Sequence, residues 1–450
     1  MMDCHVATLL AMTVMECETK GLSSLRGRRP WQSNPYIFNK KLYNDFMTIA
    51  LFSDSYLPTK SGIVTVVVQL QEQLKKMGHR VILVTVETTD EYETYDPDIY
   101  RVHSVALGLG TDQFVGIPAM HPLIHFLKDA GVQLIHCHTE FGIGKAGLRA
   151  AHVLKIPAIC TTHTMWTDFY KYYLSFGKII SPKIINGIMK KYYGKFNSLI
   201  GVSTKARNYF KQPGMLPDMP SVIIPNAIDK EKFQKNHISE EQKLALRESY
   251  GIKPDEIMMI FVGRIGEEKR VFELLQVCQN VIRKNNKIKM VFVGNGPAYD
   301  DMLDKAAPKI ATKQIIFTGF IEWTKVSEYY ESADLFVTTS LSEMHSMTIL
   351  EAQLSGLPII VRRDESYFDS VFDGENGYLT DSEEEMEQRI LELASDREKL
   401  KAFGKRSLEI TKRFTIESHI KKTIKVYEEV MKAYPRRIND IEVMKEIEDY

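Results

Sequence analysis

Residues 48–85, TIALFSDSYLPTKSGIVTVVVQLQEQLKKMGHRVILVT, contain the pattern that decides the fold. A short apolar run at 49–52 is followed by a loop with proline and glycine, a helical pattern at 64–77 and a β-branched run at 80–85. Gly78 stands where a helix commonly ends in the left-handed conformation. This order predicts a strand, a helix and a second strand.

The same alternation continues along the chain. Further strand-like runs of the first half occur at 134–136, 158–161, 199–202 and 222–224. The pattern restarts after residue 230, with strand-like runs at 258–262, 289–293, 315–318, 335–338 and 358–361. Strands that alternate with helices form parallel sheets covered on both faces. We therefore predict an α/β protein with two doubly wound, Rossmann-like domains that face each other across a cleft.

The length of 450 residues suits two domains of about 200 residues each. We place a first Rossmann-like domain at 47–228, a second at 229–425 and a charged tail at 426–450. Residues 1–46 show no clear period. We expect this stretch to be a non-native or disordered extension, with Met47 as the biological start.

The composition, 44% hydrophobic and 26% charged, is that of a soluble globular protein, and the net charge of zero indicates no nucleic-acid partner. The five cysteines are scattered without CxxC spacing, which favours a reducing compartment over a disulfide framework or a zinc site. No apolar run reaches the roughly 18 residues of a spanning helix, and no export signal is evident. We expect a cytoplasmic protein.

The unusual residues follow strands, and in open parallel sheets ligands bind beyond the carboxyl ends of strands. Gly62 lies in the first such loop, where it either admits a ligand at a helix amino terminus or forms an ordinary turn. Gly263, Arg264 and Lys269 follow the first strand of the second half. Two cations there suit a diphosphate, although a solvated basic loop has the same composition.

Glu343 and Glu351 follow the strand-like run at 335–338. Ser346 is a good amino cap, so a helix is predicted to begin there, with Glu351 about one and a half turns inside. The carboxylates suit sugar hydroxyls, although a solvated helix face explains them equally well. The backbone near the cap suits an anion, through Ser346, Met347 and Thr348.

As a set, these features resemble the GT-B glycosyltransferases of family 4. The resemblance runs from Met47 to about residue 425, and it implies that the domain at 47–228 binds the acceptor and the domain at 229–425 binds the nucleotide sugar. It is carried by Gly263-Arg264 with Lys269, Glu343 with Glu351, and the segments 224–229, 293–297 and 317–319.

The resemblance implies that Arg264 and Lys269 bind the donor diphosphate, that Glu351 binds the ribose and that Glu343 touches the donor sugar. It also implies a retaining, front-face mechanism that needs neither a metal nor another cofactor, with the leaving diphosphate helping to deprotonate the acceptor. Ser346 stands where the family usually has glycine, which leaves open how closely the backbone approaches the phosphates.

Segments 135–141 and 162–169 resemble those of bacterial diacylglycerol glucosyltransferases. In the wider family a histidine at the His163 position lines the reaction centre, and the alternative is a buried, hydrogen-bonded histidine. His136 and His138 have the spacing of strand neighbours that point the same way, but no third ligand is evident, so we predict no metal site.

Residues 169–215 contain no acidic residue but many lysines, tyrosines and apolar side chains. This composition suits a helix in the headgroup region of an anionic membrane, and the alternative is a buried apolar face with a solvated rim of lysines. The candidate membrane or acceptor residues are Lys171, Lys178, Lys183, Lys190, Lys191, Tyr192 and Tyr193.

We therefore predict a retaining hexosyltransferase that moves glucose from a UDP-sugar to a membrane lipid such as diacylglycerol, bound peripherally at the inner face of the cell membrane. One alternative is a soluble or polysaccharide-linked sugar acceptor. Another is a non-catalytic subunit that binds a nucleotide sugar, which the joint presence of Arg264, Lys269, Glu343 and Glu351 opposes.

Overall fold

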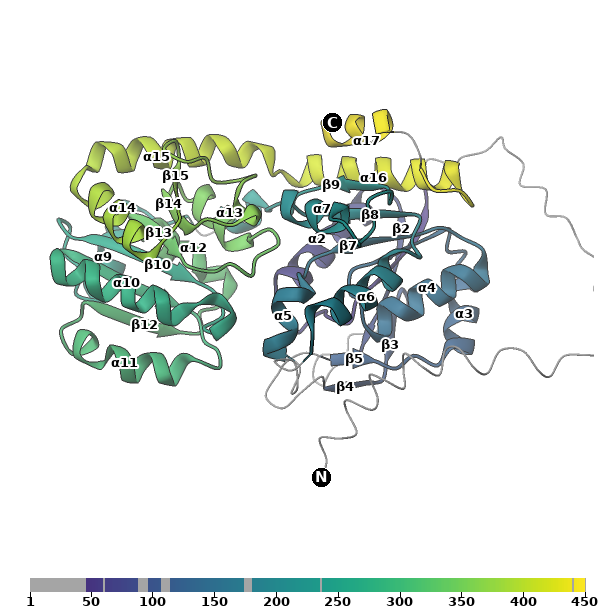
Figure 1. The fold of residues 1–450 in the computed structure, drawn as a ribbon, viewed down its shortest axis with the longest axis horizontal. Helices are drawn as coiled ribbons and strands as arrows, with labels where there is room; N and C mark the ends of the chain where they lie inside the picture. Colours follow the sequence, from purple (N-terminus) through teal and green to yellow (C-terminus); the bar gives the residue numbers. More distant parts are fainter. Residues whose placement is uncertain are drawn as a thin grey trace, which may run out of the picture.

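The computed structural model describes residues 46–59, 61–87, 96–106, 114–173, 180–234, 237–438 and 441–449. Two bodies, each built on one parallel sheet, lie side by side (Figure 1). We call them the first and second units. The extension predicted at 1–46 lies outside the described residues except for Phe46, and so does the predicted membrane residue Lys178.

The first unit is a seven-stranded parallel sheet in the order β3-β2-β1-β6-β7-β8-β9. Its strands are β1 (Thr48–Phe52), β2 (Arg80–Val86), β3 (Ile99–Val102), β6 (Leu134–Cys137), β7 (Ala158–Thr162), β8 (Ser198–Gly201) and β9 (Ser221–Ile223). Its helices are α2 (Gly62–Lys76), α3 (Met120–Asp129), α4 (Gly142–Leu154), α5 (Trp166–Tyr173), α6 (Pro182–Tyr193) and α7 (Thr204–Lys211). A two-stranded ribbon, β4 (Ser104–Ala106) with β5 (Phe114–Gly116), lies outside this sheet.

The second unit is a six-stranded parallel sheet in the order β12-β11-β10-β13-β14-β15. Its strands are β10 (Ile257–Val262), β11 (Ile288–Val293), β12 (Ile315–Gly319), β13 (Leu335–Thr338), β14 (Ile359–Arg362) and β15 (Gly377–Thr380). Its helices are α8 (Lys230–Phe233), α9 (Glu240–Ser249), η4 (Glu267–Lys269), α10 (Val271–Lys284), α11 (Tyr299–Ala311), α12 (Trp323–Ser332), α13 (Met347–Leu354), η5 (Glu365–Tyr367), α14 (Glu383–Ser395), α15 (Arg397–Ile410) and η6 (Thr411–Arg413).

Both sheets have the strand order of a doubly wound fold, which confirms the predicted fold class. The sequence of β1 is apolar because both faces of the strand are buried. Ala50 and Phe52 pack into one core, while Ile49 and Leu51 pack into the core on the opposite face. Strand order reverses between β1 and β6 and between β10 and β13. Ligand sites of such folds lie at these two reversals.

The carboxyl-terminal helix α16 (Ile416–Ala433) returns to the first unit, along which it runs in yellow in Figure 1. Its Tyr427 and Val430 are fully buried in the same core as Leu51. The predicted limit between second domain and tail, at 425, therefore falls inside one continuous helix. Helix α17 (Ile441–Asp449) then contacts β9. None of the described helices is long and apolar enough to cross a membrane.

Candidate active site

The loops after β10 and β11 pack against each other through glycines. Gly263 has φ +148°, which favours glycine, and its amide donates to the Val293 carbonyl at 3.0 Å. A Cβ on Gly294 would lie 2.0 Å from the Gly263 carbonyl oxygen, so no larger residue fits there. This packing explains both glycine motifs of the sequence and holds the start of the Arg264 loop in place.

The loop after β13 is fastened to the loop after β10 by two hydroxyls. Thr339 Oγ1 donates to the Arg270 carbonyl at 2.7 Å, and Ser342 Oγ donates to the Glu268 carbonyl at 2.8 Å. These bonds cross the reversal of strand order between β10 and β13. The predicted cations and the first predicted glutamate are thereby brought together.

Lys269 and Glu343 form an ion pair, with 2.5 Å between Nζ and Oε1. Ser340 Oγ also donates to this carboxylate oxygen at 3.0 Å. Burial by itself raises the pKa of Glu343, but the charge and hydrogen bond of Lys269, helped by Ser340 and Lys205, hold it below its usual value. Glu343 is therefore ionised and fixed in place.

Arg264 lies on the same loop, with Nε 3.8 Å from Glu268 Oε1. Its side chain is 34% exposed, whereas that of Glu268 is 7% exposed. Arg264 and Lys269 therefore each lie beside a carboxylate, and two cations held on one loop in this way suit a phosphate.

Helix α13 begins as predicted, with Ser346 as its amino cap in extended conformation. Ser346 Oγ makes no bond to the helix backbone and lies 3.0 Å from Thr348 Oγ1. Gly62 is the first residue of α2 in the first unit, and a Cβ on it would lie 3.7 Å from Met347 Cγ of α13 in the second unit. The amino termini of α2 and α13 therefore approach each other, and both favour an anion between the units.

Glu351 is buried inside α13, and two aromatic residues of α12 hold it. Tyr330 donates its hydroxyl to Oε2 at 2.9 Å, and Trp323 Nε1 donates to Oε1 at 3.5 Å. Burial raises the pKa of Glu351 to about 7, against the lowering effect of these two bonds. Neither aromatic residue could be linked to Glu351 from the sequence, because strand β13 separates α12 from α13 along the chain.

His163 follows β7, and the helix after it, α5, contacts η4, which carries Lys269. His163 is only partly exposed, and its Nε2 lies 3.0 Å from Nδ1 of His138. Burial and the nearby His419 lower the pKa of His163 to about 3. The imidazole is therefore neutral at physiological pH.

Both nitrogens of His136 already have protein partners, Tyr427 at 2.8 Å and Thr161 at 2.7 Å. The ring of His138 packs against that of His136, with 4.1 Å between the ring centroids and 35° between the ring planes. Among the described residues, no group of three or more His, Cys, Asp or Glu side chains could hold a metal ion.

The predicted membrane patch is only partly at the surface. Lys183, Lys190 and Lys191 of α6 are exposed, as is Lys171 of α5. In contrast, Tyr192 and Tyr193 are 5% and 1% exposed, which corrects the prediction that they lie at a membrane interface. The tyrosines occupy the inner face of an amphipathic helix, and their hydroxyls donate to the Thr139 carbonyl at 2.8 Å and to Glu140 at 2.6 Å.

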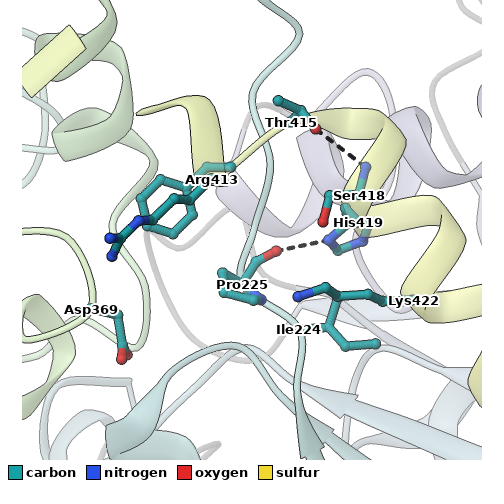
Figure 2. A pocket seen from close by; sticks show the side chains of 9 residues that line it. Ile224, Pro225, Asp369, Arg413, Thr415, Ser418, His419 and Lys422 are labelled. Carbon is teal, nitrogen blue, oxygen red and sulfur yellow. Dashed lines mark hydrogen bonds between the residues drawn. The ribbon is translucent and has the colours of Figure 1, made fainter. Parts of the chain in front are cut away.

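The chain crosses between the units twice, near Pro225 and near Thr415, and a cavity of about 180 Å³ lies between the crossings. His419 of α16 donates from Nδ1 to the Pro225 carbonyl at 2.8 Å (Figure 2). Asn226, in the segment 224–229 singled out from the sequence, donates to the His345 carbonyl at 3.1 Å. This segment therefore links the crossing to the loop that carries Glu343.

Helix α7 of the first unit is docked onto the second unit. Lys205 Nζ donates to the Leu341 carbonyl at 2.8 Å and pairs with Asp364 at 2.9 Å. Thr204 donates through its amide and its hydroxyl to Asp369, both at 2.7 Å. Because Leu341 lies two residues before Glu343, these bonds fix the loop that carries Glu343 relative to the first unit.

Replacing Lys205 by methionine is expected to lower the melting temperature by about 5 °C, because it leaves Asp364 largely buried without its cation. Differential scanning calorimetry measures this change. The matched control is Lys287→Met, whose partner Asp255 is at a similar distance, 2.8 Å, but highly exposed, so a shift below about 1 °C is expected. Equal shifts in the two variants would contradict the structural role of Lys205.

Two Rossmann-like units, with Arg264, Lys269 and Glu343 gathered at the strand-order reversal of the second, have the architecture of a GT-B glycosyltransferase. The comparisons with known proteins agree. Residues 60–232 match the model of Glycosyltransferase Family 4, and residues 242–409 match that of Glycosyl transferases group 1.

Curated relatives match most of the chain. The chain is 30% identical to the alpha-monoglucosyldiacylglycerol synthase of Acholeplasma laidlawii, over 87% of this chain and 100% of that protein. It is also 30% identical to the synthase of the same name from Streptococcus pneumoniae, over 77% and 78%. The chain belongs to glycosyltransferase family 4.

A solved structure supports the fold. The Anabaena protein HepE, crystallised with UDP and glucose, superimposes with a TM-score of 0.65 over 85% of this chain and 99% of that chain, at 16% identity.

Proposed function

We propose that this protein transfers glucose from UDP-glucose to a diacylglycerol-type lipid, with retention of the anomeric configuration. The observation that carries this proposal is the 30% identity to an alpha-monoglucosyldiacylglycerol synthase along that protein's full length. The ionised Glu343 with its Lys269 partner supports a catalyst over a subunit that only binds the donor.

The donor would lie between the amino termini of α2 and α13. Arg264, Lys269 and the α13 amides supply the positive field that a diphosphate needs, and Glu351 accepts hydrogen bonds from the ribose hydroxyls. A nucleotide of this kind, UDP, is bound in the Anabaena structure of the same fold. Glu343 would contact the sugar.

Catalysis would need no metal and no other cofactor, since the two cations neutralise the charge that develops on the leaving diphosphate. The acceptor hydroxyl would attack from the face that the diphosphate leaves, and the diphosphate would take its proton. Retention follows from attack on that face.

The lipid acceptor would be reached from the inner face of the cell membrane. On α6, Lys183, Lys190 and Lys191 are exposed, and so is Ile184, at 58%. This combination suits an anionic bilayer surface, because the lysines reach phosphates while an apolar side chain inserts. Helix α5, which contacts α6 on one side and η4 on the other, connects this surface to the donor site.

Donor affinity is expected to rise about 10-fold between pH 6 and pH 8. Glu351 has its pKa raised to about 7, so its carboxylate, the better acceptor of ribose hydroxyls, becomes populated as pH increases through that value. Calorimetric titration with UDP-glucose, whose diphosphate diester does not titrate in this range, measures the effect. Glu351→Gln should bind weakly with no pH dependence, and an unchanged slope in this variant would exclude Glu351 as the cause.

The proposed function is tested with the purified enzyme, a panel of nucleotide sugars, EDTA, and acceptors that include diacylglycerol in anionic micelles. Transfer of glucose to the lipid in EDTA is the expected result. Turnover of the donor with transfer only to a soluble sugar would instead assign a soluble acceptor, and donor binding without turnover would assign a binding subunit.

A further inference from the structure

Three histidines of the first unit stand in a row that leads to the proposed reaction centre. The His138 ring lies between those of His136 and His163, with centroid distances of 4.1 Å and 5.3 Å. His138 Nδ1 and His163 Nε2 are 3.0 Å apart, which is a hydrogen bond between two ring nitrogens. One of the two nitrogens must carry the proton and the other must accept it.

Both rings are neutral, so each has one protonated nitrogen. Burial, followed by the neighbouring histidines, holds the pKa of His138 well below its usual value, and burial does the same for His163. The direction of the bond between them therefore decides which nitrogen of His163 carries the hydrogen.

The other nitrogen of His138 fixes this direction. His138 is 1% exposed, and its Nε2 is buried without a hydrogen-bond partner. A proton on Nε2 would be a buried donor with no acceptor, which native structures rarely tolerate, whereas a buried lone pair is tolerated more often. The proton of His138 is therefore on Nδ1, from which it donates to His163 Nε2.

We propose that His138 is a positioning residue that holds His163 in the tautomer with its proton on Nδ1, so that His163 presents an N–H donor to an oxygen of the reacting sugar or acceptor. Among the described residues, the only hydrogen bond of the His163 ring runs to His138. Nδ1 is thus the nitrogen left for a ligand. The identity of that ligand rests on the proposed function, but the tautomer does not.

His136 holds His138 in this orientation. Its own nitrogens are fixed by Thr161 of β7 and by Tyr427 of α16, so the His136 ring that packs against His138 cannot turn freely. The row therefore ties the orientation of His163 to the helix that returns from the second unit.

A histidine with its proton already on the ligand-facing nitrogen is not a base. In this state His163 can stabilise negative charge on an oxygen, but it cannot take the proton of the acceptor hydroxyl. That proton must go to another group, which agrees with the leaving diphosphate as the acceptor of the proton.

Nitrogen-15 NMR of the full chain with labelled histidine side chains tests the tautomer without any need for activity. The signals of His163 are assigned by their loss in His163→Gln. Protonated and unprotonated ring nitrogens resonate far apart, so the expected result is a protonated Nδ1 and an unprotonated Nε2 at pH 8. A protonated Nε2 would overturn the proposal, whatever the enzyme's substrates prove to be.

Variants test the positioning role. His138→Leu should lower kcat about 30-fold with little change in the KM for the donor, because the ring of His163 loses its fixed tautomer. His138→Asn, whose amide can donate from near the Nδ1 position, should recover kcat to within about 5-fold of the wild type. Equal losses in both variants, with native thermal stability, would refute the role of the hydrogen bond. A protonated Nδ1 in an enzyme that transfers no sugar would refute only the proposed function.

Discussion

Replacement of Lys269 by methionine is expected to lower kcat by about 10³-fold. Lys269 is one of two cations placed where the diphosphate would depart, and removing one such charge-stabilising group commonly costs 10²- to 10³-fold. The loss should lie in kcat more than in the donor KM, since the charge on the diphosphate grows as the bond breaks. Steady-state kinetics with UDP-glucose and micellar diacylglycerol measure both constants.

The control for this prediction is Lys284→Met, which removes a lysine of the same unit that is 54% exposed and paired with Glu387. Its kcat should stay within about 2-fold of the wild type. Lys269→Met also leaves the carboxylate of Glu343 without its cation, which can disturb the loop. The double variant Lys269→Met with Glu343→Gln removes this unpaired carboxylate, so it separates the loss of the lysine charge from disturbance of the loop. Wild-type kcat in Lys269→Met would remove this lysine from the mechanism.

Neutralising Lys183, Lys190 and Lys191 together with glutamine should weaken binding to vesicles that contain phosphatidylglycerol by about 100-fold. Each lysine near an anionic surface contributes about 1 kcal/mol, so three contribute about 3 kcal/mol. Sedimentation with vesicles gives the partition constant, and the effect should shrink as salt is added. The KM for UDP-glucose should not change.

A second triple variant provides the control. Lys253, Lys405 and Lys412 are exposed lysines of the second unit, and their replacement by glutamine changes the net charge equally. This variant should bind vesicles almost as tightly as the wild type. Equal weakening in the two variants would mean that total charge, and not the α6 surface, drives binding.

The central strands were predicted well from the sequence. A strand buried on both faces, such as β1 or β10, consists of a continuous run of mostly apolar residues. The prediction missed β3 and β15, which lie at sheet edges and consist of four residues each, IYRV and GYLT. The end of the chain was predicted to be a charged tail. Its many charged residues form the polar face of α16, and apolar residues of the opposite face, such as Tyr427, pack against residues far earlier in the sequence.

For the candidate site, the sequence located the loops but not their contacts. Arg264, Lys269 and Glu343 could be found because they follow strands, and the structure brings them onto neighbouring loops. The bond from Lys205 to the Glu343 loop could not be found, because it depends on how the two units dock. Tyr192 and Tyr193 were misplaced because aromatic residues beside lysines suit a membrane interface as well as the inner face of a helix.

The most direct test of the central claim is the anomeric configuration of the lipid product. The enzyme is incubated with UDP-glucose and diacylglycerol in phosphatidylglycerol micelles containing EDTA, and the glycolipid is examined by proton NMR. The account predicts a glucosyl-diacylglycerol whose anomeric proton shows the small coupling of the α-anomer. A β-linked glucolipid, or a strict requirement for a divalent metal, would contradict it.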